Sequence, residues 1–129
     1  MSQAIHDAAV AGDSLVAEFY ERYQTQRDNL VQLYSDSSSV MWNGNLYYGT
    51  EAIRGLLAQL PQCRFSIHSY DAQPITAAAS GNIAVTMVSV AGYVQYANSS
   101  PKPFSHTFVI QIDVTSNALF IQSECMRFL

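Results

Sequence analysis

The sequence predicts an α+β domain in which N-terminal helices pack on one face of a curved antiparallel sheet. Apolar residues follow a helical period only before Pro61, and every later segment reads as β-strand. The length of 129 residues fits one domain, residues 1–129. A domain of this size buries roughly 65–70% of the surface of its unfolded chain, so it needs neither disulfides nor a structural metal.

Helices are expected first along the chain. An amphipathic helix is predicted from Gln3 to about Gln24, because apolar residues recur there every three or four positions. A short helix is expected from Asp28 to Tyr34, followed by a turn in the serine-rich stretch 35–39. Thr50 is expected to cap a third helix, and Pro61 to end it, because the residue before a proline avoids the α region.

The strands follow. Two short runs, residues 40–42 and 46–48, flank Asn43-Gly44, the strongest short-range signal for a hairpin. Four longer strands are expected to form an antiparallel meander, over Phe65 to Pro74, Ile83 to Ala97, Phe104 to Val114 and Leu119 to Leu129. Turns are expected between them at residues 80–82, 98–101 and 115–117.

The surface is short of charge. Charged residues make up 12% of the chain, against about 25% in an average soluble domain, and 49% of residues are apolar. In the strand from Ile83, alternation places Met87 and Tyr93 on one face and Val88 and Val90 on the other. Helices can cover only one side of such a sheet, so a second chain is expected to cover the other. An obligate dimer is the simplest arrangement.

The composition also excludes several classes of function. A formal net charge of -4 without clustered basic residues argues against direct binding of nucleic acid. Cys63 and Cys125 lie in no metal-ligand spacing, and the N-terminus carries no targeting signal, which favours a reduced, intracellular protein. Uninterrupted apolar stretches fall far below the roughly 18 residues of a membrane span. We therefore expect no metal, no cofactor and no membrane contact.

Catalytic motifs are missing. The sequence contains no G-x-S-x-G, H-E-x-x-H, C-x-x-C or glycine-rich phosphate loop. Helices over a curved sheet can nevertheless enclose an acid/base pocket, for which the candidates are Tyr20, Tyr34, His68, His106 and Glu124. We favour the interpretation that His68 and His106 are structural strand residues with one polar partner each, and that the tyrosines are core rings with their hydroxyls at the surface, so the protein is expected not to be an enzyme.

Arg127 is the candidate binding residue. Alternation in the last strand places Ile121, Ser123, Cys125 and Arg127 on one face, so a single guanidinium ends a small, apolar surface. Arg127 is either an exposed residue near the terminus or one half of an ion pair with a carboxylate of a partner chain.

A series of short motifs carries a family resemblance over nearly the whole chain. The segments are 20–23, 27–34, 40–45, Leu60-Pro61, 71–74, 104–108 and 123–128. In this order and spacing they resemble the nuclear transport factor 2 superfamily, and within it the mRNA export cofactors. The resemblance implies a cone-shaped fold that dimerises through the open face of its sheet. It implies a heterodimer with the similar domain of a large mRNA export receptor, in the nucleus, the cytoplasm and the nuclear pore. Nucleoporins would be contacted only indirectly.

The resemblance also implies roles for single residues. It pairs Arg127 with an aspartate of the receptor and places Cys125 on the same surface, while Ser123 and Ile121 follow from strand alternation alone.

Two alternatives stay open: a homodimeric carrier of GDP-bound Ran, and a small-molecule isomerase or dehydratase that uses the cone. The acidic residues of the Ran carrier correspond here to Asn43, Asn98 and Ser100, and its early tryptophan corresponds to Ala8.

Overall fold

The computed structural model describes residues 3–76, 83–113, 115–116 and 118–129. The elements in chain order are α1 (Gln3–Thr25), α2 (Arg27–Leu30), a 3₁₀ turn (Val31–Leu33), β1 (Tyr34–Trp42), β2 (Asn45–Tyr48), α3 (Thr50–Gln59), β3 (Cys63–Thr76), β4 (Ile83–Tyr96), β5 (Lys102–Asp113) and β6 (Leu119–Phe128). Helices precede the long strands, and the predicted α+β class is confirmed.

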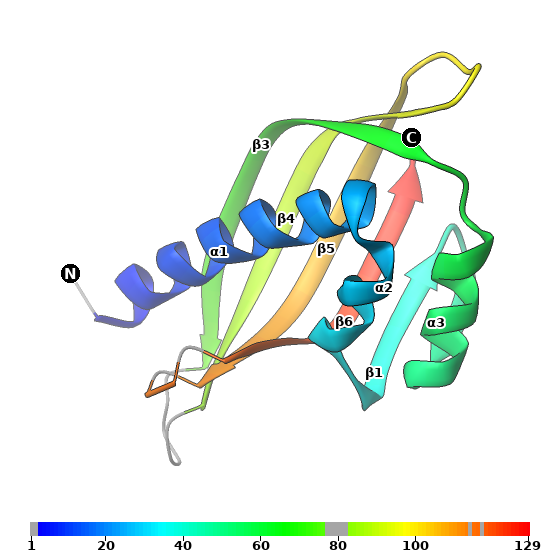
Figure 1. Cartoon of the computed structure of the whole chain (residues 1–129). Coiled ribbons are helices and arrows are strands. Elements are labelled where there is room, and N and C mark those ends of the chain that lie inside the picture. Colours follow the sequence, from blue (N-terminus) through cyan, green and yellow to red (C-terminus); the bar gives the residue numbers. More distant parts are fainter. Residues whose placement is uncertain (1–2, 77–82, 114, 117) are drawn as a thin grey trace.

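The strands form one curved sheet in the order β2-β1-β6-β5-β4-β3. Strands β3 to β6 form the predicted antiparallel meander. The β1–β2 hairpin joins it through β1, which runs parallel to β6. Figure 1 shows α1 and α2 in front of the sheet, so helices cover one of its two faces.

The covered face of the sheet carries large apolar side chains, and we call it the core face: Val88, Val90, Val94, Phe104, Phe108, Ile110 and Met126, all buried. Leu15 and Phe19 of α1 pack against this face, and Ile53 of α3 belongs to the same core. Fully burying a Leu, Ile, Val or Phe side chain contributes about 1.5–3 kcal/mol, so burial of this face contributes strongly to the stability of the fold.

The side chains on the opposite face are mostly smaller and more exposed, and we call this face the open face. Its residues are Met87, Ser89, Ala91, Tyr93, Ser105, Thr107, Val109, Ser123, Cys125 and Arg127. These side chains range from half-buried to exposed. The predicted division of β4 into two faces is confirmed, with small residues at the centre of the open face. Among the described elements, no helix lies over it (Figure 1).

Individual residues determine the course of the chain at the connections between elements. Asn43 (φ 45°) and Gly44 (φ 91°) adopt the positive φ that a tight hairpin turn needs, as predicted. Helix α3 ends at Gln59, and Leu60 is extended before Pro61, also as predicted. The expected Thr50 cap is wrong, because Gly49 (φ 87°) occupies the position before the helix. Its N–H donates to the carbonyl of Ser38.

Two further expectations fail or fall outside the described chain. The predicted turn at 35–39 is part of β1, because Ser38 is fully buried and its hydroxyl donates to the carbonyl of Ile121 at 2.5 Å. The short helix stops at Leu30, and Tyr34 is the first residue of β1 rather than the last of a helix. The turn expected at 80–82 and residues 114 and 117 lie outside the described residues.

The close approach of β3 and β4 requires a glycine at position 92. A Cβ atom at this position would lie 2.2 Å from the carbonyl oxygen of Ser66, so a side chain would push the two strands apart. Gly92 pairs with Ile67, next to a bulge at which His68 has no pairing partner. Bulges increase the local twist of a sheet, so this one adds to the twist of β3, the strand that packs against α1.

Candidate functional site

The open face contains a hollow between β5, β6 and the β1–β2 hairpin. Its volume is about 540 Å³, and the residues around it include Met41, Leu46, Thr107, Val109, Cys125 and Arg127. Apolar and small side chains dominate these walls, and the guanidinium of Arg127 is the single cationic group among them. Such a hollow fits a side chain of another protein better than a charged small molecule.

Three of the four predicted binding residues lie together on this face. Ser123, Cys125 and Arg127 pair with Val109, Thr107 and Ser105 of β5. Ser123 and Cys125 are half-buried, whereas Arg127 is exposed. Arg127 forms no hydrogen bond or ion pair with any residue that the structure describes. Its charge is therefore available to a partner.

The placement of Ile121 on this face is wrong. Val109 pairs with Ser123 and Ile110 with Ile121, so Gln122 is an unpaired bulge residue. The bulge reverses the alternation, which turns Ile121 to the core face, where it is fully buried. The sequence shows no glycine or proline that would reveal such a bulge.

The core holds four of the five candidate acid/base residues in one buried network. The hydroxyl of Tyr20 lies 2.9 Å from Nδ1 of His106, and Nε2 of His106 lies 2.7 Å from Oε2 of Glu124. The hydroxyl of Tyr34 donates to Oε1 of Glu124. The fifth candidate, His68, lies elsewhere: it is exposed, and its ring stacks edge-on against Tyr93 at 5.1 Å.

The donors and acceptors of this network match one another. With Glu124 ionised and the proton of His106 on Nε2, the carboxylate accepts from His106 and Tyr34, and Nδ1 accepts from Tyr20. Burial raises the pKa of Tyr20 and of Tyr34 well above the usual value, and the Glu124 carboxylate raises both further. Both tyrosines are therefore protonated donors at neutral pH. Each of these four side chains has its hydrogen-bond partners inside the protein, which fits a structural role.

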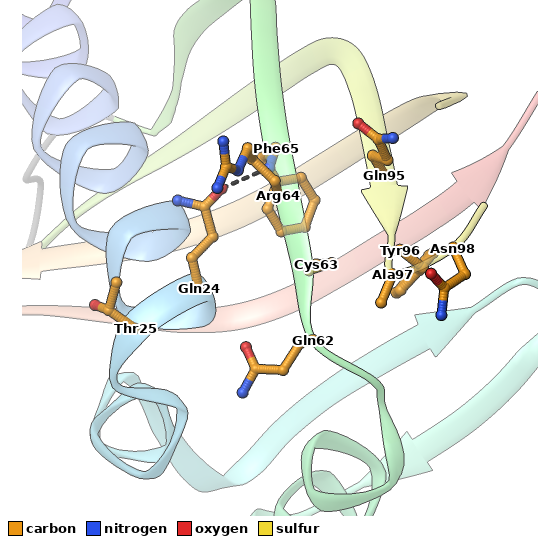
Figure 2. A pocket seen from close by; sticks show the side chains of 10 residues that line it. All are labelled: Gln24, Thr25, Gln62, Cys63, Arg64, Phe65, Gln95, Tyr96, Ala97 and Asn98. Atoms are coloured by element: carbon orange, nitrogen blue, oxygen red, sulfur yellow. Dashed lines mark hydrogen bonds between the residues drawn. The ribbon is translucent and has the colours of Figure 1, made fainter. Parts of the chain in front are cut away.

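A second hollow opens beside the end of α1, where β3 begins and β4 ends (Figure 2). Its volume is about 710 Å³, and Gln24, Gln62, Gln95 and Asn98 supply side-chain amides to its walls. Two of these amides have hydrogen-bond partners: Oε1 of Gln24 accepts the backbone N–H of Phe65 at 2.5 Å, and Nε2 of Gln95 donates to the carbonyl of Ser99 at 3.2 Å.

The chemistry of this second hollow is unsuited to proton transfer at neutral pH. Among the described residues that line it, none carries a carboxylate or an imidazole. Burial raises the pKa of the Cys63 thiol to about 11 and that of Tyr96 to about 12, so both are neutral near pH 7. A general acid or base with a pKa near the working pH is what such catalysis requires.

Asn43, Asn98 and Ser100, which the resemblance aligns with the acidic residues of a Ran carrier, are exposed and uncharged in this chain. Asn98 and Ser100 lie after β4, and the side chain of Asn43 accepts the backbone N–H of Phe128 at 2.8 Å. Ala8 is buried against the core rather than exposed.

The described part of the chain shows neither a metal-binding cluster nor a membrane-spanning helix. No group of three or more His, Cys, Asp or Glu side chains is arranged to hold a metal ion there. No described helix is both long and apolar enough to cross a membrane.

Sequence reasoning missed the hairpin side of the open-face hollow. Met41 and Leu46 contribute to its walls, and Leu46 is 63% exposed. Alternation around the predicted Asn43-Gly44 turn would have placed both on the face opposite Val40, which is buried. The parallel pairing of β1 with β6 brings them beside Cys125.

Comparisons with known proteins agree with this fold. The nuclear transport factor 2 (NTF2) domain family matches residues 11–128. NTF2-related export protein 2 of Mus musculus is 30% identical over 96% of this chain and 89% of its own length. Nuclear transport factor 2 of Oryza sativa is 31% identical over 94% of this chain and 96% of its own. The solved structure of nuclear transport factor 2 from Cryptosporidium parvum superposes with a TM-score of 0.82, at 24% identity and 95% coverage of both chains. The chain belongs to the NTF2 domain family.

Proposed function

We propose that this protein is a non-enzymatic subunit for nuclear mRNA export. Its open face would bind the NTF2-like domain of a larger mRNA export receptor, and the pair would carry messenger ribonucleoprotein through the nuclear pore. The protein would move between nucleus and cytoplasm and contact nucleoporins only as part of the pair.

One observation carries this proposal: Arg127 stands exposed and unpaired at the rim of the open-face hollow, beside Cys125. Guanidinium groups suit interfaces because they bind a carboxylate in a bidentate way and keep their charge. The similarity to export proteins and nuclear transport factors over most of the chain supports a role in nuclear transport. An acidic protein without basic clusters is also suited to binding protein rather than RNA.

The test is a mass measurement by light scattering. The purified chain is mixed with the NTF2-like domain of the export receptor from the same organism, and a one-to-one complex is expected. Arg127→Asp should abolish the complex, because it places a carboxylate opposite the receptor's aspartate. An Asp→Arg change in the receptor should restore it, which identifies the pair.

The matched control is Arg54→Asp, the same change on α3. Arg54 forms an exposed pair with Glu51 at 3.8 Å, a contact of little energetic weight. The control should bind the receptor domain as the wild type does. Failure of the wild-type chain to bind the receptor domain overturns the proposal, as does unchanged binding by the Arg127→Asp variant.

The Ran alternative needs a separate assay. Asn43, Asn98 and Ser100 carry no charge, so a pull-down with GDP-bound Ran is expected to capture none of this protein. Capture of Ran would replace the export proposal with the carrier interpretation.

A further inference from the structure

The hollow beside the end of α1 (Figure 2) has one unpaired cation in its walls and takes no part in the proposed function. Arg64 is exposed and forms no hydrogen bond or ion pair with a described residue. None of the described residues that line the hollow is acidic. We propose that this hollow binds an acidic segment of another protein as an extended peptide, with a carboxylate of the peptide held by Arg64 and Gln24.

Gln24 supplies the second donor for the carboxylate. Its Oε1 accepts the backbone N–H of Phe65 at 2.5 Å, so only its NH₂ group remains without a described partner. Figure 2 shows this carboxamide reaching from the last turn of α1 to β3, where Arg64 is the residue before Phe65. A guanidinium and an amide NH₂ group donate hydrogen bonds and accept none, so together they suit an oxygen anion.

Tyr96 supplies a further donor on the β4 side of the hollow. Its hydroxyl is buried and has no hydrogen-bond partner among the described residues. Burial raises the pKa of Tyr96 to about 12, so the hydroxyl keeps its proton near pH 7. A buried hydroxyl without a partner is costly, and a carbonyl oxygen of a bound peptide would satisfy it.

The backbone of β3 explains why the ligand is an extended peptide. β3 is an edge strand of the sheet, so alternate N–H and C=O groups point away from β4. The N–H of Phe65 is one of these groups, since it donates to Gln24 instead of to β4. The same alternation directs the N–H and C=O of Cys63, which also borders the hollow, away from β4. An added strand bonds to such edge groups through its own backbone.

The side-chain amides of Gln62 and Asn98 complete the walls. Each amide both donates and accepts, as a peptide group does, so these side chains match the backbone of a bound segment. The volume of about 710 Å³ lies within the range of roughly 300–1,000 Å³ that is usual for ligand sites. The hollow is therefore large enough for several residues of a peptide.

The experiment measures fluorescence anisotropy of a labelled hexapeptide in which glutamate and valine alternate, with both ends blocked so that only side chains carry carboxylates. Valine favours the extended conformation. The wild-type chain should bind this peptide with a dissociation constant below about 1 mM. Lysine in place of glutamate should weaken binding at least about tenfold, because the charge is reversed. Proline in place of the valines should do the same, because it removes backbone N–H groups.

Two variants test the carboxylate site. Gln24→Glu keeps an oxygen acceptor for the N–H of Phe65 but replaces the donating NH₂ group by oxygen, so it should weaken binding at least about tenfold. Arg64→Gln removes the charge of an exposed side chain and should have an effect of the same size. The matched control is Gln111→Glu on β5, outside the hollow, where the Gln111 amide donates to Gln122 at 2.8 Å. The control adds the same charge and should change the dissociation constant less than about threefold.

The proposal is overturned if the glutamate peptide does not bind at about 1 mM, if the lysine peptide binds equally well, or if both variants bind as the wild type does. Free glutarate that binds as tightly as the peptide would also overturn it, because the site would then recognise a small carboxylate. The hollow lies outside the open face, so this inference and the export proposal fail separately. Gln24→Glu should lose the peptide and still bind the receptor domain.

Discussion

The two faces of β5 show how one strand serves two purposes. Phe104, His106 and Phe108 on the core face are fully or almost fully buried. Ser105, Thr107 and Val109, which alternate with them, are half-buried and smaller. The core face packs against aromatic rings of α1. For example, the ring centroids of Phe108 and Phe19 lie 4.9 Å apart. The open face instead carries the exposed charge of Arg127, which forms no ion pair with a described residue, and it contains a hollow.

This difference separates folding from association. Removing a side chain from the core face leaves a cavity or an unsatisfied polar group, which lowers the free energy of unfolding. Removing one from the open face leaves the folded chain nearly unchanged and alters only what another chain can contact. Neighbouring residues on one strand are therefore matched tests of the two roles.

Phe108→Ala should have the largest effect on stability. The side chain is fully buried, so its loss should lower the free energy of unfolding by about 3–5 kcal/mol, out of a total of about 5–15 kcal/mol for a typical domain. The next residue provides the control: Thr107→Ala should cost less than about 1 kcal/mol. Urea unfolding at one fixed protein concentration measures both. Equal losses would contradict the division of the strand into two faces.

Glu124→Gln should have an intermediate effect. The amide retains one oxygen acceptor, so either His106 or Tyr34 loses its partner in a buried site, at a cost of about 1–3 kcal/mol. Ser123→Ala, one residue away on the open face, should fall within about 0.5 kcal/mol of the wild type. Urea unfolding compares the pair. A Glu124→Gln variant as stable as the wild type would show that the network does not stabilise the fold.

Most of the fold could be predicted from the sequence, because periodicity and turn chemistry are local signals. The long helix, the hairpin at Asn43-Gly44, the stop at Pro61 and the meander all rest on patterns within a few residues. The family resemblance is confirmed by the match over residues 11–128.

The failures at Ser38 and Ile121 have a different origin, since each depends on contacts between distant segments. Ser38 belongs to a strand because β6 offers the carbonyl of Ile121, 83 positions along the chain. Ile121 faces the core because a bulge at Gln122 interrupts the pairing of β6 with β5. The open-face hollow needs β1 to lie parallel to β6, a pairing that local patterns do not reveal. The role of Arg127 stays a proposal for the same reason: its partner belongs to another chain.

The smallest effect is expected from Tyr23→Phe, which removes one of two buried hydroxyls, those of Tyr23 and Tyr96, that lack a hydrogen-bond partner among the described residues. The Tyr23 hydroxyl is buried without a hydrogen bond to a described residue. Its removal at pH 7 should leave the free energy of unfolding unchanged or raise it by up to about 1 kcal/mol. Burial raises the pKa of Tyr23 well above the usual 10.0, so in the wild type this group's contribution to stability is present below pH 10 and lost as the pH rises beyond it. The variant should lose stability less steeply above pH 10 in urea titrations. Tyr96→Phe should show the same change more weakly, because the pKa of Tyr96 rises only to about 12. A loss of more than about 1 kcal/mol at pH 7 would mean that Tyr23 donates to a partner in solution, and the core would then be as fully satisfied there as it is around Glu124.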